Sequence, residues 1–157
     1  MQKITPFLWF DNQAEEAMNF YTAIFKNSKV GKISRYGEAF PDKNGQVMTA
    51  TFELFGQEFM VLNGGPLFRF NESVSFFVHC EDQQEVDYYW EKLTSGGGQE
   101  SRCGWLKDKY GLSWQIAPAV MGELLGGNDK KRIERVTQAF LKMKKFDIAA
   151  LKQAAAG

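Results

Sequence analysis

The chain has 157 residues, and its 19 basic and 19 acidic side chains cancel at neutral pH. This length suits one domain with a substantial core, and zero net charge gives no field that attracts nucleic acid or an anionic membrane. We find no apolar run long enough to cross a bilayer and no secretory signal pattern. We therefore expect a cytoplasmic protein that binds small molecules or a second copy of itself, without nucleic acid or membrane.

The first part of the chain reads as one strand, one helix and three further strands. Ile4–Phe10 is a continuous apolar run, and Ala14–Phe25 carries apolar residues at helical spacing behind two glutamates. Three alternating segments follow, of which the last two form a hairpin around Gly56 and Gln57: Lys29–Tyr36, Val47–Phe55 and Glu58–Asn63.

The same order of elements then begins again. Ser73–Cys80 is an apolar strand, and Gln84–Leu93 is an amphipathic helix that the glycine run Gly96–Gly98 ends. The repeat of roughly 70 residues predicts two βαβββ modules, at residues 3–65 and 72–118, within a single domain of residues 1–157. The predicted fold class is therefore α+β, followed by C-terminal helices over residues 122–157.

The second module closes with a hairpin in the segment Cys103–Ile116. Asp108 can hydrogen-bond the backbone of its own turn, and Gly111 can take a positive φ. In the strand that follows, a period of two places Ser113 and Gln115 on one face and the apolar residues on the other. The apolar face belongs to the core, and the other face is either wet or functional.

The C-terminal tail is predicted to form two capped helices. Asn128 and Asp129 can cap a helix with an apolar stripe that begins at Ile133, and Asp147 can cap a second helix that contains Leu151. Such stripes need a surface to cover. They can pack on their own chain or on a second copy, and we expect a homodimer.

Several segments together resemble the PhnB-like subgroup of the vicinal oxygen chelate superfamily. They are ITPFLWFDNQAEEAMNFY, GQEFMVLNGGP, EVDYYWEKL, CGWLKDKYGLSWQI and KMKKFDIAAL. The superfamily includes glyoxalase I, bleomycin-resistance proteins and extradiol dioxygenases, and many members of this subgroup carry the label 3-demethylubiquinone-9 3-methyltransferase. The resemblance implies two βαβββ modules whose curved sheets enclose a central cavity, with a divalent metal on its floor in active members.

The places that the resemblance assigns to metal ligands hold poor ligands in this chain. They fall on Ile4, Asn63, Ser75 and Gln115. Transition metals prefer imidazole, thiolate or carboxylate, so we predict no metal and no cofactor. His79, the one histidine of the chain, lies on the face of Ser75, and Cys80 points to the opposite face.

Two functions remain open on this basis. The first is a binding protein whose cavity holds a small apolar or aromatic molecule, with the metal site degenerate. The second is a metal-dependent enzyme of the glyoxalase or dioxygenase kind, whose metal His79, Gln115 and the loop Gly37–Gly45 recruit. The methyltransferase activity of the label is a weaker alternative, because the first strand ends without a glycine-rich turn. The predicted cavity residues are Leu8, Asn63, Ser75, Phe77, His79, Ser113 and Gln115.

Overall fold

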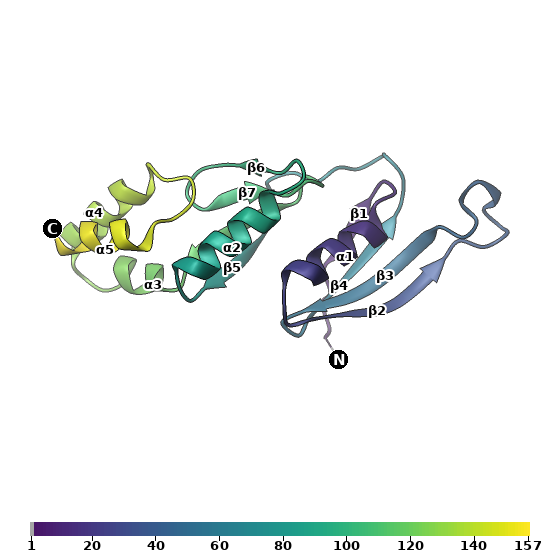
Figure 1. The fold of residues 1–157 in the computed structure, drawn as a ribbon, viewed down its shortest axis with the longest axis horizontal. Coiled ribbons are helices and arrows are strands. Elements are labelled where there is room, and N and C mark those ends of the chain that lie inside the picture. The colour runs from purple at the N-terminus through teal and green to yellow at the C-terminus, as the bar shows by residue number, and fades with distance from the viewer. Residues whose placement is uncertain (1) are drawn as a thin grey trace. The chain divides into compact units, whose positions relative to one another are not determined.

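A computed structural model describes residues 2–157 and divides the chain into two compact units, which meet in sequence at Phe70 and Asn71 (Figure 1). The first unit contains one helix, four strands and a short 3₁₀ helix. Their bounds are β1 (Phe7–Phe10), α1 (Ala14–Ile24), β2 (Ser28–Arg35), the 3₁₀ helix Pro41–Lys43, β3 (Val47–Leu54) and β4 (Gln57–Asn63).

The second unit repeats this order and continues into three helices. Its elements are β5 (Ser75–Cys80), α2 (Gln83–Thr94), β6 (Gln99–Glu100), β7 (Trp105–Lys107), β8 (Ser113–Pro118), α3 (Val120–Leu125), α4 (Lys130–Phe140) and α5 (Ile148–Ala156). Within the described part of the chain, no helix is long and apolar enough to cross a membrane.

The two sheets have the same topology. The strand orders are β1-β4-β3-β2 and β5-β8-β7-β6, and in each sheet the first and last strands of the βαβββ unit pair in parallel. All other pairs are antiparallel. The predicted α+β class with two βαβββ modules and a helical tail is confirmed.

In each unit one helix covers one face of the sheet (Figure 1). In the first unit Tyr21 of α1 stacks on Phe52 of β3, which stacks in turn on Phe59 of β4, with ring centroids 6.0 and 5.3 Å apart. In the second unit the buried residues of α2 face Trp114 and Ile116 of β8. The apolar face that the sequence assigned to the core of the second unit is therefore confirmed.

The β3–β4 hairpin turns one residue earlier than predicted. Leu54 pairs with Gln57, so the turn residues are Phe55 and Gly56, with φ of 49° and 78°. Two consecutive residues with positive φ fit the right-handed twist of a two-residue hairpin. Phe55 is an unusual residue for this conformation, which is why the sequence pattern favoured Gly56 and Gln57.

The helical tail packs within the second unit. Val136 of α4, Leu151 of α5 and Phe146 between them form a buried cluster with Ala117 of β8. Of the predicted caps Asp129 and Asp147 are confirmed, because the carboxylate of Asp129 accepts a hydrogen bond from the first turn of α4, and Asp147 does the same for α5. Of the two surfaces that the stripes could cover, the tail covers its own chain.

Candidate functional site

The hairpin β7–β8 is fixed by a buried carboxylate in its turn. Asp108 is 2% exposed and accepts hydrogen bonds from the backbone N–H groups of Tyr110 and Leu112 and from the indole of Trp114, at 2.9, 3.1 and 2.9 Å. Gly111 has a φ of 85°, as predicted. The aspartate therefore ties the turn to the core, and this fixes the register of both strands.

The register defines a sheet face turned away from α2, which we call the far face. Residues paired directly across two strands point to the same side. Because Trp114 and Ile116 face α2, the alternate residues of β8 and their partners face away. The far face comprises Ser75, Phe77 and His79 of β5, Trp105 and Lys107 of β7, and Ser113 and Gln115 of β8.

One polar pair lies at the centre of the far face. The Gln115 side-chain amide donates to the Ser75 hydroxyl at 2.9 Å, and Gln115 itself pairs across the strands with Phe77 on one side and Trp105 on the other. Gln115 is half-buried, whereas Phe77 is 49% exposed. An amide thus stands between two aromatic side chains on a surface that α2 does not cover.

His79 lies at the end of the same face. Its ring contacts Phe77 with centroids 4.7 Å apart, and the residue is exposed. Cys80 is fully buried on the opposite face, where desolvation raises the pKa of its thiol to about 12. A protonated, buried thiol that points away from the imidazole cannot act with it as a nucleophile pair.

Two of the predicted cavity residues lie elsewhere, in the helix-covered core of the first unit. Leu8 is buried and pairs with the core residue Val61. Asn63 is also buried, and its amide accepts from Ala14 N–H at 2.8 Å and donates to Val47 C=O at 3.0 Å. The expectation that these two side chains line a cavity is corrected. The amide of Asn63 instead satisfies the first turn of α1 and the start of β3.

The physical reason for the error is the apolar composition of β1. Both faces of the segment Phe7–Phe10 are apolar, so a period of two could not decide which residues face the helix. The residues of β1 that face away from α1 are Phe7 and Trp9. Trp9 donates its indole N–H to Gly65 C=O at 2.9 Å and contacts the ring of Phe68.

Sequence reasoning missed two residues of the far face, Trp105 and Lys107. Neither is among the cavity residues that the sequence predicts. The hairpin register contained the signal, because a turn closed by Asp108 and Gly111 pairs Trp105 with Gln115 and Lys107 with Ser113. Lys107 forms an ion pair with Glu72, which lies in the segment before β5.

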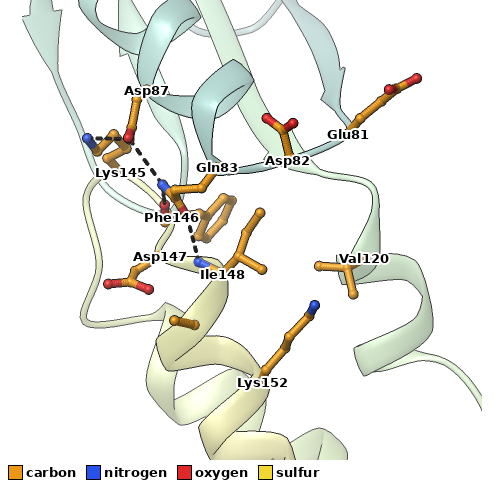
Figure 2. Close-up of a pocket in the computed structure, with 11 residues that line it drawn as sticks. Glu81, Asp82, Gln83, Asp87, Val120, Lys145, Phe146, Asp147, Ile148 and Lys152 are labelled. Atoms are coloured by element: carbon orange, nitrogen blue, oxygen red, sulfur yellow. Dashed lines mark hydrogen bonds and ion pairs between the residues drawn. The ribbon is translucent and has the colours of Figure 1, made fainter.

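A pocket of about 730 Å³ lies at the start of α2, beside α3 and α5 (Figure 2). Three of the carboxylates that line it already serve the structure. Asp82 caps α2 and Asp147 caps α5, while Asp87 pairs with Lys145 at 2.6 Å. The hydrogen bond of the Lys145 ammonium lowers the pKa of Asp87 below its ordinary value. We therefore interpret this pocket as the seam where the tail attaches.

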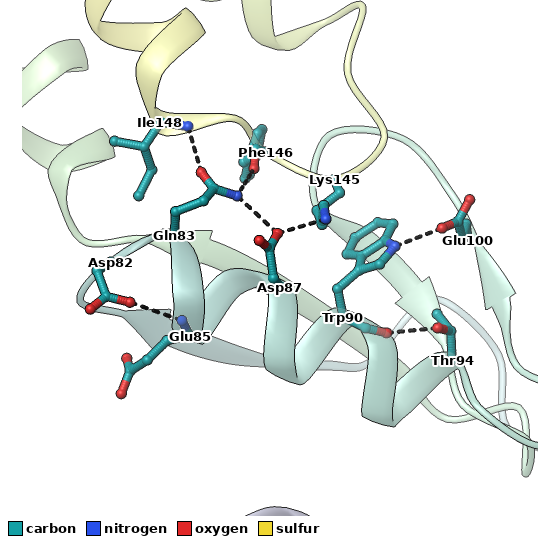
Figure 3. Close-up of polar contacts among 10 residues, drawn as sticks. All are labelled: Asp82, Gln83, Glu85, Asp87, Trp90, Thr94, Glu100, Lys145, Phe146 and Ile148. Carbon is teal, nitrogen blue, oxygen red and sulfur yellow. Dashed lines mark hydrogen bonds and ion pairs between the residues drawn. The ribbon is translucent and has the colours of Figure 1, made fainter.

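Gln83 joins the tail to α2 through both ends of its amide (Figure 3). The amide NH₂ donates to Phe146 C=O and to the Asp87 carboxylate, each at 3.0 Å, and the amide oxygen accepts from Ile148 N–H at 2.8 Å. Two backbone bonds, from Cys103 N–H to Met143 C=O and from Gly104 N–H to Lys144 C=O, fix the same segment. Residues 143–148 are thus held by polar contacts along their length.

The donor set of the far face does not fit a transition metal. It offers one imidazole, from His79, together with hydroxyl and amide groups, which bind divalent ions weakly. Among residues 2–157, no group of three or more histidine, cysteine, aspartate and glutamate side chains is arranged to hold a metal ion.

The two βαβββ sheets, each with its strands in the order first, fourth, third and second, define the glyoxalase-like, vicinal oxygen chelate fold. A family model described as 3-demethylubiquinone-9 3-methyltransferase matches residues 2–117. The chain belongs to this PhnB-like family. Comparison with curated protein sequences gave no match.

Solved structures agree with this placement. A PhnB protein from Bacillus cereus, described as a 3-demethylubiquinone-9 3-methyltransferase, is 45% identical and has a TM-score of 0.69, with 75% of this chain and 100% of that chain covered. Protein PA1353 from Pseudomonas aeruginosa is 16% identical and has a TM-score of 0.61, with 75% of this chain and 98% of that chain covered. The fosfomycin resistance protein FosX from Listeria monocytogenes is also 16% identical and has a TM-score of 0.56, with 80% of this chain and 98% of that chain covered. The last two show the fold alone. The family match ends at Ala117, just before the helical tail.

Proposed function

We propose that the protein binds a small molecule with an apolar or aromatic body on the far face of the second sheet. The observation that carries this proposal is the Gln115–Ser75 hydrogen bond between the aromatic side chains of Phe77 and Trp105. Ligand sites are mostly apolar, with a few placed polar groups that set the orientation of the ligand. The far face offers the rings of Phe77 and Trp105 as its apolar part and the Gln115–Ser75 pair as its placed polar groups.

The amide of Gln115 suits a role in orientation. An amide carries no charge and does not titrate, so it can only donate and accept hydrogen bonds. Its NH₂ group has a second hydrogen besides the one given to Ser75, and its oxygen has acceptor capacity. A ligand with one or two polar atoms beside an apolar ring would use both.

The chemistry of the far face supports binding better than the alternatives. A metal-dependent reaction would need stronger ligands than a lone imidazole, a hydroxyl and an amide provide. The methyl transfer named in the family description would need a site for a methyl donor. No residue of the far face indicates a site for a methyl donor, so we propose binding as the function.

The test is a fragment screen followed by one substitution on the far face. Gln115→Leu should weaken a fragment that binds there by roughly tenfold, the value of one hydrogen bond, and should leave the unfolding midpoint near that of the wild type. Gln57→Leu is the matched control, because Gln57 is an exposed glutamine at the start of β4 in the first unit. Equal affinity of wild type and Gln115→Leu for every fragment would refute the proposal.

A further inference from the structure

A small pocket opens on the far face beside the Gln115–Ser75 pair. Its volume is about 310 Å³, large enough for a small aromatic molecule, and all its residues belong to the second unit. It is lined by Glu72, Ser101, Trp105, Leu106, Lys107 and Ser113. The following inference rests on the proposed function and concerns the chemical class of the ligand.

The hydroxyl of Ser113 gives the pocket an unsatisfied polar group. Ser113 is 0% exposed, and its Oγ has no hydrogen-bond partner among residues 2–157. Buried hydroxyls nearly always have a partner, so an unpaired one in a pocket wall needs an explanation. A ligand atom that accepts a hydrogen bond would satisfy it.

The ammonium group of Lys107 lies on the same row of the sheet. Lys107 pairs directly across the strands with Ser113, and its ion-pair partner is the carboxylate of Glu72. The hydrogen bond from Lys107 lowers the pKa of Glu72, so this carboxylate is ionised at neutral pH. The carboxylate of Glu72 therefore already pairs with the Lys107 ammonium in the pocket that Ser113 also lines.

The bond to Glu72 is one that a ligand can replace. The Glu72 side chain is 59% exposed and that of Lys107 is 35% exposed, and ion pairs this close to solvent contribute little to stability. A ligand carboxylate would keep the charge pairing with Lys107 and would add the hydrogen bond from Ser113 that Glu72 does not make. Charge-assisted bonds of this kind are stronger than neutral ones.

We propose that this pocket binds a monocarboxylate with an aromatic body, and that Glu72 holds the carboxylate position until the ligand displaces it. The anchors are Lys107 and Ser113. The indole of Trp105, half-buried in the pocket wall, provides the surface for the ring. The Gln115–Ser75 pair, on β8 and β5, can orient the remainder of a larger ligand.

Benzoate and its neutral counterpart benzamide test this inference by NMR titration of the full chain. The Trp105 indole signal should move with benzoate, and benzamide should bind at least five times more weakly. Ser113→Ala should reduce the benzoate affinity about fivefold. Glu72→Gln should increase it about threefold, because the competing carboxylate is gone. Glu53→Gln, which breaks an ion pair of the first unit with Lys29, is the matched control and should have no effect.

Each other outcome has a definite meaning. Equal binding of benzoate and benzamide, or an unchanged benzoate affinity in both Ser113→Ala and Glu72→Gln, would overturn the carboxylate inference. If neutral fragments nevertheless bound the wild type more tightly than Gln115→Leu, the proposed function would stand although the carboxylate inference had failed. A loss of benzoate binding in Glu72→Gln would show that Glu72 is part of the site and not a competitor, and this too would overturn the inference.

Discussion

The two βαβββ units have one topology but stabilise their first helix in different ways. Helix α2 is capped from its own sequence, because Asp82 Oδ1 accepts from Glu85 N–H at 2.9 Å. Helix α1 has no side-chain cap at Gln13, and its first turn is satisfied by Asn63 from the end of β4. The same fold therefore uses a local contact in one unit and a contact across 49 residues in the other.

The sheet faces opposite the two helices differ as well. In the first unit this face carries Phe7 and Trp9 of β1 together with Thr49 and Thr51 of β3, and the indole N–H of Trp9 donates to Gly65 C=O. In the second unit it carries Lys107, Ser113 and the Gln115–Ser75 pair. Strands in corresponding positions of the two sheets thus carry different polar groups, with threonine hydroxyls in the first unit and an ammonium, hydroxyls and an amide in the second.

The largest predicted effect concerns the attachment of the tail, which only the second unit has. A side chain at Gly104 would meet the ring of Phe146 at 2.5 Å and Ile116 C=O at 2.8 Å, and φ there is 81°. Gly104→Ala should therefore cost about 3 kcal/mol, from the left-handed backbone together with the overlap. Gly111→Ala is the control, since Gly111 has a φ of 85° and a Cβ added there would meet no atom within 4 Å. It should cost about 1 kcal/mol in urea unfolding.

The second prediction compares the stability cost of removing the side chain that satisfies the start of each helix. Asn63→Ala would leave Ala14 N–H and Val47 C=O buried without their partner, and should cost about 2 kcal/mol or more. Asp82→Ala removes an exposed cap and should cost about 1 kcal/mol. Denaturant unfolding measures both changes. A larger loss in Asp82→Ala than in Asn63→Ala would contradict the distinction between a buried and a local cap.

The third prediction separates stability from binding on the far face. Ser113→Ala removes an unpaired buried hydroxyl, so it should raise the free energy of unfolding by about 1 kcal/mol. Ser75→Ala is the comparison, because it removes a hydroxyl that accepts from Gln115 and should lower stability. A destabilised Ser113→Ala would mean that this hydroxyl already has a partner.

The smallest effect concerns pH. The Lys145 ammonium lowers the pKa of Asp87 in the folded protein. The pair therefore stabilises the tail attachment fully at pH values above the ordinary carboxyl pKa, which is near 3.9. This contribution is lost as the pH falls through the lowered value. The stability difference between wild type and Asp87→Asn should be under 1 kcal/mol at pH 6 and should shrink toward pH 2. A difference that grows on acidification would reverse the assigned sign.

Much of the fold could be predicted from the sequence because its signals are local. The capping aspartates Asp129 and Asp147 precede apolar stripes, and the turn chemistry of Asp108 and Gly111 sets the parity of β8. Local chemistry of this kind is visible in a window of a few residues. These predictions are confirmed by the structure.

The failures occurred where the deciding contact was distant in sequence. Nothing near Asn63 indicates that its amide completes a helix that begins at Ala14, so a buried structural residue resembled a ligand-facing one. In β1 the continuous apolar run concealed which side faces α1, and Leu8 was placed on the wrong face. Trp105 and Lys107 were missed because hairpin pairing, and not strand composition, brings them beside Gln115 and Ser113.

The indole N–H signals of the four tryptophans provide the most direct test of where a ligand binds. Trp105 is on the far face of the second sheet, whereas Trp9 faces away from α1 in the first unit. Trp90 and Trp114 donate to the carboxylates of Glu100 and Asp108. In a titration with an aromatic fragment that binds the protein, the Trp105 signal should move and the other three should stay in place. A shift of Trp9 with Trp105 unchanged would place the site in the first unit and contradict the account.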